Sequence, residues 1–350
     1  MIAGPRLLAL IILIVPCLAF AEVYDLPPAG NDVIGAVTII QARADDTLIE
    51  IARRHGLGYE DIVRANPDVD TWLPGEGSDV ILPTRFVLPT GERRGLILNL
   101  AEYRLYYFPE PIGDEPAIVM TYPMSIGRMD WETPLGRTSV ISKVTDPAWY
   151  PPASVRAEHA AEGEILPRIV PPGPKNPLGR HAMRLGLPGY LIHGTNRPAG
   201  VGMRVTHGCI RLFPEDIGFL FTQISVDTPV RIINEPVKIG WNGNELVVEV
   251  HEPLEVTPPA VNEAGAESET DAPMKSEVVA ESDQAAPEAR NQLTALTEQF
   301  VAATNTRPGQ LYWDIAEQLL ERADGVPTLA GRQIKDAATS AASEKVPSSL

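Results

Sequence analysis

The sequence predicts a mainly β, sandwich-like domain, preceded by a small α+β unit and followed by a short α-helical region. Through residues 94–234, short apolar and β-branched segments alternate with loops rich in Pro and Gly. Residues 36–84 have a strand–helix–helix–strand pattern, and two helical periodicities follow residue 290. A length of 350 residues is enough for two or three such domains.

Residues 1–21 have the pattern of a signal peptide. Arg6 precedes an apolar run that ends at Phe20, and Ala19-Phe20-Ala21 is the small-x-small pattern that signal peptidase cuts. The run is short for a membrane span, so a retained anchor is the weaker alternative. We therefore expect an exported protein that begins near Glu22 and has no transmembrane segment after cleavage.

The net charge and the number of cysteines limit which partners and which chemistry the protein can have. A net charge of −17 argues against nucleic acid as a partner. Once residues 1–21 are removed, Cys209 is the single cysteine of the chain. Exported proteins usually pair their cysteines, so an unpaired one indicates an intermolecular link or a reactive thiol.

The unit at residues 36–84 begins with a β-branched strand. Asp46 or Thr47 is placed to cap the helix that follows, because both side chains accept hydrogen bonds from a helix N-terminus. A second short helix is expected over 59–65, and a strand over 80–82 closes the unit.

This unit resembles a LysM module, a small domain that binds glycans containing N-acetylglucosamine. The resemblance is carried by Asp46-Thr47-Leu48, Ile51-Ala52, Gly56, Ile62, Ala65-Asn66-Pro67 and Ile81-Leu82-Pro83. Asp45 departs from the pattern, since many members carry Gly there. The resemblance implies glycan binding through Asp46, Thr47, Asn66 and Pro67; a generic α+β packing unit is the alternative.

Residues 94–234 read as the mainly β domain. The expected elements are a hairpin over 95–109, strands over 117–124, 138–144, 190–193 and 230–233, and one helix over 215–224. Many short strands separated by turn signals are typical of a sandwich.

The C-terminal third changes composition twice. A β-hairpin extension is expected over 235–255, with its turn at Asn242-Gly243 or Gly243-Asn244. Residues 256–290 are rich in Ala, Glu, Ser and Pro, which predicts a disordered acidic linker. Residues 291–324 are expected to form a helical hairpin that packs on itself, in preference to a partner-binding element, and 325–350 to form a disordered tail.

The stretch from Ile192 to Leu212 concentrates the reactive side chains. It holds His193 and the run Thr206-His207-Gly208-Cys209. A cysteine nucleophile needs a nearby base that takes its proton, and donors aimed at the oxyanion that forms on the substrate. Gly208 allows close approach of backbone to a substrate.

The residues alone leave three interpretations of this stretch open. The first is a Cys/His acyl-transfer enzyme. The second is a zinc site formed by His193, His207 and Cys209, although no second cluster with ligand spacing exists in the sequence. The third is an inert buried cysteine beside core histidines.

The same stretch resembles the signature of the L,D-transpeptidase catalytic domain of YkuD type. In that family a His is followed, about a dozen residues later, by Ser/Thr-His-Gly-Cys, as His193 and residues 206–209 are here. The resemblance spans residues 94–250. It implies that Cys209 is the nucleophile, that His193 accepts and donates the proton, and that the backbone carbonyl of Gly194 orients the imidazole.

Further roles follow from the resemblance. It implies an oxyanion hole bordered by Thr206, His207 and Gly208, a substrate-binding Arg211, and cleft walls at Tyr190 and Trp149. It implies no cofactor and no metal.

The implied reaction is acyl transfer on peptidoglycan. The Cys209 thiolate attacks a tetrapeptide stem, releases D-alanine and passes the acyl group to an amine. A LysM-like unit in front resembles the Gram-negative subgroup that attaches an outer-membrane lipoprotein to peptidoglycan in the periplasm. The alternatives are 3→3 cross-linking of stems, hydrolysis as an L,D-carboxypeptidase and, in a different class, a non-catalytic wall-binding scaffold.

Overall fold

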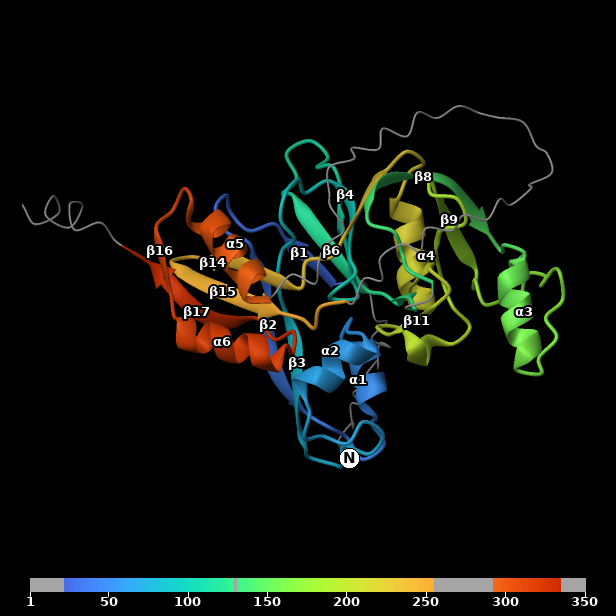
Figure 1. Cartoon of the computed structure of the whole chain (residues 1–350), viewed down its shortest axis with the longest axis horizontal. Helices are drawn as coiled ribbons and strands as arrows, with labels where there is room; N and C mark the ends of the chain where they lie inside the picture. Colours follow the sequence, from blue (N-terminus) through green and yellow to red (C-terminus); the bar gives the residue numbers. More distant parts are fainter. Residues whose placement is uncertain (1–21, 129–130, 255–291, 335–350) are drawn as a thin grey trace, which may run out of the picture.

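The computed structural model describes residues 22–128, 131–254 and 292–334 (Figure 1). The expected signal peptide and acidic linker, together with residues 335–350, lie outside this part of the chain. Across the described ranges, no helix is long and apolar enough to cross a bilayer.

One nine-stranded sheet forms the middle of the molecule. Its spatial order is β1 (Glu22–Asp25), β6 (Ile118–Pro123), β5 (Arg104–Phe108), β4 (Gly95–Asn99), β13 (Pro229–Ile233), β8 (Gly136–Thr145), β9 (His181–Leu185), β10 (Leu191–His193) and β12 (Ile210–Arg211). The mainly β character predicted for this region is confirmed. The first strand, β1, was not expected from the sequence.

The sandwich-like arrangement is produced by one bent sheet in place of two separate sheets. The first part of β8 pairs with β13 and its second part with β9, with an irregularity between Val140 and Ser142. A bulge of this kind bends a strand and increases its twist. Both parts of the sheet bury side chains in one core, together with α4 (Pro214–Gln223).

The N-terminal unit has the expected order β2 (Val33–Gln41), α1 (Leu48–Arg54), α2 (Tyr59–Ala65) and β3 (Asp79–Val87). Thr47 caps α1 in a capping box with Glu50. The core of this unit continues into the nine-stranded sheet, because Leu48 and Ile62 share a cluster with Ile97 and Tyr106. The unit is therefore fused to the sheet through a common core.

A buried arginine strengthens this junction. Arg104 on β5 is 1% exposed, donates to the Asp61 carboxylate of α2 at 2.5 Å, and lies over the Phe86 ring with 4.2 Å to its centroid. A buried cation is tolerated only where it is paired in this way.

In the C-terminal third, the expected self-packed helical hairpin is wrong, and so is the disorder expected over residues 328–333. The hairpin β14 (Val237–Asn242) and β15 (Glu245–Val250) is present, but the later helices do not pack only on each other. The elements that follow residue 291 are α5 (Gln292–Thr304), β16 (Gly309–Leu311), α6 (Trp313–Arg322) and β17 (Thr328–Gln333). Their strands extend the hairpin into a four-stranded sheet of order β14-β15-β17-β16 (Figure 1).

The reason lies in the hairpin, which carries apolar side chains at alternate positions along one of its faces. Val237, Ile239 and Trp241 form one core with Leu296 of α5 and Leu319 of α6. The helices cover this face and bury it. Residues 328–333, expected in a disordered tail, pair with β15 and complete the sheet.

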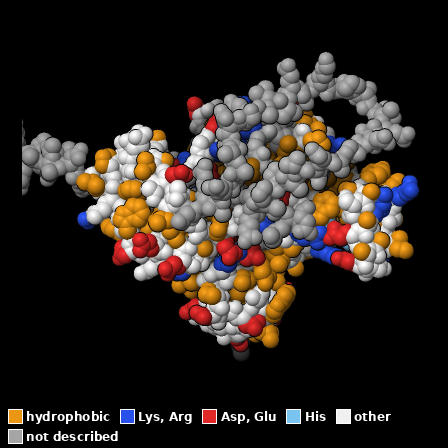
Figure 2. Space-filling view, viewed as in Figure 1, with side chains coloured by type: hydrophobic (Ala, Val, Ile, Leu, Met, Phe, Trp, Pro, Cys, Tyr) orange, Lys and Arg blue, Asp and Glu red, His pale blue; other side chains and the backbone are white. Residues whose placement is uncertain are grey.

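Smaller elements surround the sheet's β10–β12 end. They are β7 (Ile126–Gly127), β11 (Arg204–Thr206), α3 (Ala153–Ala161) and a 3-10 turn at Pro198–Gly200. The segment that carries α3 projects from the body, and Figure 2 shows acidic and basic side chains together where it joins.

Candidate active site

His193 lies at the end of β10 and is 4% exposed. Its Nδ1 lies 2.6 Å from the carbonyl oxygen of Gly194. A carbonyl oxygen only accepts, so Nδ1 carries the hydrogen and Nε2 is left with its lone pair. The contact expected between this imidazole and Gly194 is therefore present, and it favours the tautomer that can accept a proton.

Strand pairing places Cys209 next to β10, the strand that ends in His193. The strands β10 and β12 are parallel neighbours, with His193 opposite Arg211. Side chains alternate along a strand, so Cys209, two residues before Arg211, belongs to the same face as His193. The thiol is partly exposed and lies 3.6 Å from the carbonyl oxygen of Gly189.

Burial determines the protonation states of Cys209 and His193 in the free enzyme. It raises the pKa of the Cys209 thiol, while a backbone hydrogen bond from Leu191 and the charge of Arg211 act in the opposite direction. Burial, and then the charge of Arg211, lowers the pKa of His193 to about 3. The pair thus rests as a neutral thiol and a neutral imidazole at pH 7.

Residues 206–208 form a tight turn in front of Cys209. The Thr206 hydroxyl donates to the Cys209 carbonyl at 2.6 Å. Gly208 has a φ of +94°, and a Cβ there would lie 2.9 Å from the Tyr190 ring. Only glycine accommodates both conditions. The Tyr190 ring therefore lies against this turn, and its role as a cleft wall stays a prediction.

His207 points away from the turn and toward α3. Its Nε2 lies 2.9 Å from the Glu158 carboxylate, and the Trp131 ring meets its ring edge-on at 5.3 Å. Arg128 also donates to Glu158. Hydrogen bonds from Arg128 and then from His207 lower the pKa of Glu158. The His207 side chain thus links the turn to α3, so any part in the oxyanion hole falls to its backbone.

Trp149 lies at the base of the segment that carries α3. Its backbone exchanges two hydrogen bonds of 2.9 Å with Val170. The described contacts do not place its side chain beside Cys209, and its role as a cleft wall stays a prediction.

Arg211 has unused hydrogen-bonding capacity. Within the described residues, its Nε is buried without a hydrogen-bond partner. Burial, and then the charge of the exposed Arg197, lowers the pKa of Arg211. Two guanidinium groups within electrostatic reach of each other suit a carboxylate ligand.

The sequence reasoning missed the residues that hold the turn in place. Thr133 donates through its hydroxyl to the Gly208 carbonyl at 2.8 Å. Ser125 exchanges two backbone hydrogen bonds with Arg211, and its hydroxyl donates to the Gly200 carbonyl at 2.8 Å. Glu158 and these two hydroxyls lie outside any motif, so no local signal marked them. Arg197 lies within the 192–212 stretch but is not one of its motif residues.

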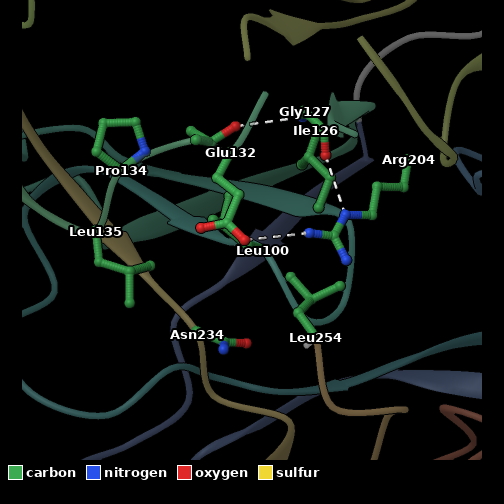
Figure 3. A pocket seen from close by; sticks show the side chains of 10 residues that line it. Leu100, Ile126, Gly127, Glu132, Pro134, Leu135, Arg204, Asn234 and Leu254 are labelled. Carbon is green, nitrogen blue, oxygen red and sulfur yellow. Dashed lines mark hydrogen bonds and ion pairs between the residues drawn. The ribbon is translucent and has the colours of Figure 1, made fainter. Parts of the chain in front are cut away.

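A pocket lies behind this turn, on the side of β7 and β11 (Figure 3). The Glu132 carboxylate and the Arg204 guanidinium face each other across it at 3.9 Å. Arg204 Nε also donates to the Gly127 carbonyl at 3.1 Å. Cys209 is not among the residues that line this pocket.

The glycan-binding residues expected in the N-terminal unit need correction. The Asp46 carboxylate is buried, where it pairs with Arg54 at 2.5 Å and accepts the Arg43 N–H at 2.9 Å. The Asn66 amide is buried and bonds to the backbone of Ile62 and Ile81. Both side chains are occupied in holding the fold.

The other two residues of that set lie at the surface. Thr47 is the N-cap of α1, and Pro67 is exposed. The same part of the unit exposes two large apolar side chains that the sequence reasoning did not select, Trp72 and Leu73.

The zinc alternative is not supported by the geometry. His207 is turned to Glu158, and His193 Nδ1 is taken by Gly194. Among the described residues, the carboxylate and imidazole atoms close enough for one ion belong to Glu102, Glu249 and His251. The Lys238 ammonium lies among them, 2.5 Å from Glu102 and 3.0 Å from Glu249. This cluster is therefore a buried ion pair.

Comparison with known proteins gives one consistent result. Residues 93–232 match the model of the L,D-transpeptidase catalytic domain, YkuD. The chain is 42% identical over 242 residues to "Probable L,D-transpeptidase YcfS" of Escherichia coli K12, covering 67% of this chain and 74% of that protein. It is 40% identical over 247 residues to "Probable L,D-transpeptidase ErfK/SrfK" of Salmonella typhimurium, covering 69% and 78%.

A solved structure is also similar. The catalytic domain from the E. faecium L,D-transpeptidase, determined by NMR, aligns at 20% identity and a TM-score of 0.31. The alignment covers 41% of this chain and 100% of that one.

Proposed function

The chain belongs to the L,D-transpeptidase family and is an enzyme of that kind, and from this premise we propose that Cys209 and His193 carry its acyl transfer. The observation that supports these roles most directly is the hydrogen bond from His193 Nδ1 to the Gly194 carbonyl. It leaves Nε2 as a base on the face of the sheet that carries Cys209. This is the base-and-orienter arrangement that activates a nucleophile.

The proposed donor is a tetrapeptide stem of peptidoglycan. As Cys209 Sγ bonds to the carbonyl carbon of the third residue, its proton passes to His193 Nε2. Backbone N–H groups of the 206–209 turn stabilise the oxyanion. The C–N bond then breaks, the leaving D-alanine amine takes the proton from His193, and a thioester remains on Cys209.

An acceptor amine completes the cycle. It attacks the thioester carbon and gives its proton to His193 Nε2. The C–S bond breaks, and the proton returns to Cys209. The thioester retains the energy of the cleaved peptide bond, so no nucleotide is needed.

For the acceptor we propose an amine of an outer-membrane lipoprotein. The enzyme would then act in the periplasm. The glycan-binding unit expected at residues 36–84 supports this choice, since holding a strand raises the local concentration of its stems. The exposed Trp72 and Leu73 are better placed than Asp46 and Asn66 to contact sugar rings.

The test is incubation of the protein with disaccharide-tetrapeptide, with and without a lysine-ended lipoprotein peptide, read by mass spectrometry. A peptide-linked muropeptide with release of D-alanine supports the proposal. A stem dimer would instead indicate 3→3 cross-linking, and a free tripeptide would indicate hydrolysis. Full D-alanine release by Cys209→Ala would overturn the assigned nucleophile.

A further inference from the structure

The N-terminal unit touches the loop that joins the two reactive residues. Residues 196–203 lie in the connection between His193 and Cys209, and their backbone meets the start of α2. The Tyr59 N–H donates to the Val201 carbonyl at 3.0 Å, and the Glu60 N–H donates to the Gly202 carbonyl at 3.3 Å.

These bonds satisfy backbone N–H groups at the N-terminus of α2. The first N–H groups of a helix have no acceptor within the helix. The N-cap of α2 is Gly58, which has no side chain to accept from them. The carbonyls of the 196–203 loop take that place, so the loop caps a helix of another unit.

The approach of the two backbones is as close as their residues allow. A Cβ on Gly58 would lie 2.7 Å from the Gly202 Cα, and one on Gly202 would lie 2.4 Å from the Tyr59 nitrogen. Gly58 itself has an ordinary φ of −90°. Glycine is required at position 58 by the contact, not by backbone conformation.

The same loop is tied to the reactive face at its other side. Ser125 donates from its hydroxyl to the Gly200 carbonyl and pairs through its backbone with Arg211. The loop carries the exposed Arg197, and within the described part of the chain the Nε of Arg211 is buried without a hydrogen-bond partner. A continuous set of hydrogen bonds therefore runs from α2 through this loop to the arginine beside His193.

We propose that the N-terminal unit is a positioning element of the active site, which holds the 196–203 loop so that Arg197 and Arg211 together bind the terminal carboxylate of the stem. Gly58, Tyr59 and Gly202 are positioning residues and do not touch substrate. The inference rests on the proposed function for its choice of substrate, while the contact itself does not depend on it.

Two changes break the contact in different ways. Gly58→Ala inserts a methyl between the backbones and suits the φ of that position. Tyr59→Pro deletes the N–H that bonds to Val201, at the first helical position, where proline is well tolerated. The matched controls are Gly200→Ala, whose methyl meets only Val205 at 3.8 Å, and Tyr59→Ala, which keeps the N–H.

Affinity is measured in the Cys209→Ala background, by calorimetry with the free tetrapeptide stem and with the same stem amidated at its C-terminus. We expect Gly58→Ala and Tyr59→Pro to weaken binding of the carboxylate form about tenfold, with no change for the amidated form or in the controls. In the cysteine-containing protein, KM should rise with kcat nearly unchanged.

Three results would overturn the proposal. These are unchanged affinity in both variants, an equal loss for the amidated stem, or a loss that matches the fraction of protein unfolded by circular dichroism. Failure of the proposed function is a separate observation, because it would appear as an unreactive stem in the wild-type protein, whereas the affinity comparison uses no turnover.

Discussion

The imidazole Nδ1 of His193 lies 2.6 Å from the carbonyl oxygen of Gly194, the next residue in the chain. A histidine held by its own neighbour needs no carboxylate partner to fix its tautomer. The absence of a negative charge at Nδ1 is consistent with the strongly lowered pKa of this buried ring. The arrangement favours proton transfer during attack over a preformed thiolate–imidazolium pair.

The first prediction concerns the base. His193→Ala should lower the rate of acyl-enzyme formation by about 10²- to 10⁴-fold, because it removes the imidazole that we propose as the general base. Intact mass spectrometry of the protein with tetrapeptide stem measures the Cys209 adduct over time. An adduct that forms at the wild-type rate would show that another group acts as the base.

The second prediction is the pH dependence of activity. The base must be neutral, so kcat/KM should fall only as pH drops toward 3, the pKa of His193, and not near its ordinary value of 6.5. Measured D-alanine release between pH 7 and pH 5 should therefore show no loss due to this group. A decline with a midpoint near 6.5 would contradict the buried, neutral imidazole.

The third prediction is the matching effect on stability. The unfolded chain binds a proton at His193 below pH 6.5, but the folded chain does not until about pH 3, so stability must fall as pH falls through this window. Between these two pKa values, His193 should lower the free energy of unfolding by about 1.4 kcal/mol for each pH unit of acidification. Urea unfolding of the wild type and His193→Gln at several pH values tests it, since the variant should lose this part of the slope.

The sequence predicted much of the site and of the central domain, for physical reasons that can be named. His193 and Cys209 lie within one short stretch of sequence. The strands β10 and β12 lie at the two ends of that stretch and pair with each other, so local sequence is enough to predict that the two residues belong to one site. Two short apolar runs with a turn at residues 99–102 between them likewise predicted the hairpin of β4 and β5.

The features that could not be predicted from the sequence depend on contacts between distant segments of the chain. Thr133 and Ser125 act through single hydroxyl groups on backbone carbonyls, which leave no pattern in the sequence. Strand β17 is six residues long, contains a glycine and pairs with a strand about eighty positions earlier, so its partner could not be seen locally. Asp46 and Asn66 were chosen as polar residues of a resembling module, but polarity alone does not show which way a side chain points.

The fourth prediction follows from the turn in front of Cys209. Gly208→Ala requires a φ of +94° that alanine rarely adopts, and it drives a methyl to within 2.9 Å of the Tyr190 ring. We expect kcat to fall by about 100-fold, because small displacements of reacting groups are costly. The D-alanine release assay measures it. Adding Tyr190→Ala should recover only part of the loss, because it removes the collision and leaves the backbone strain.

The fifth prediction concerns the buried ion pair at the junction of three units. Lys238 of β14 is fully buried and bonds to the Glu102 carboxylate, to Glu249 and to the Val87 carbonyl at 2.6 Å. Burial raises the pKa of Glu102 to about 6. At Glu249 the charge of Lys238, together with hydrogen bonds from His251 and from the Val87 N–H, outweighs burial and lowers the pKa to about 2. After burial itself, the ammonium is the largest influence on the pKa of Glu249, and it favours the ionised carboxylate.

Removing that cation should therefore lower the stability of the fold strongly. Lys238→Met removes the ammonium that pairs with both buried carboxylates, and we expect a loss of about 3–5 kcal/mol in the free energy of unfolding, measured by urea denaturation. The matched control is Lys238→Met combined with Glu102→Gln and Glu249→Gln, which has no buried charge at these positions and should recover much of the loss. If the single variant unfolds at the wild-type urea concentration, the three units are held together by their apolar cores, and this cluster contributes little to the junction.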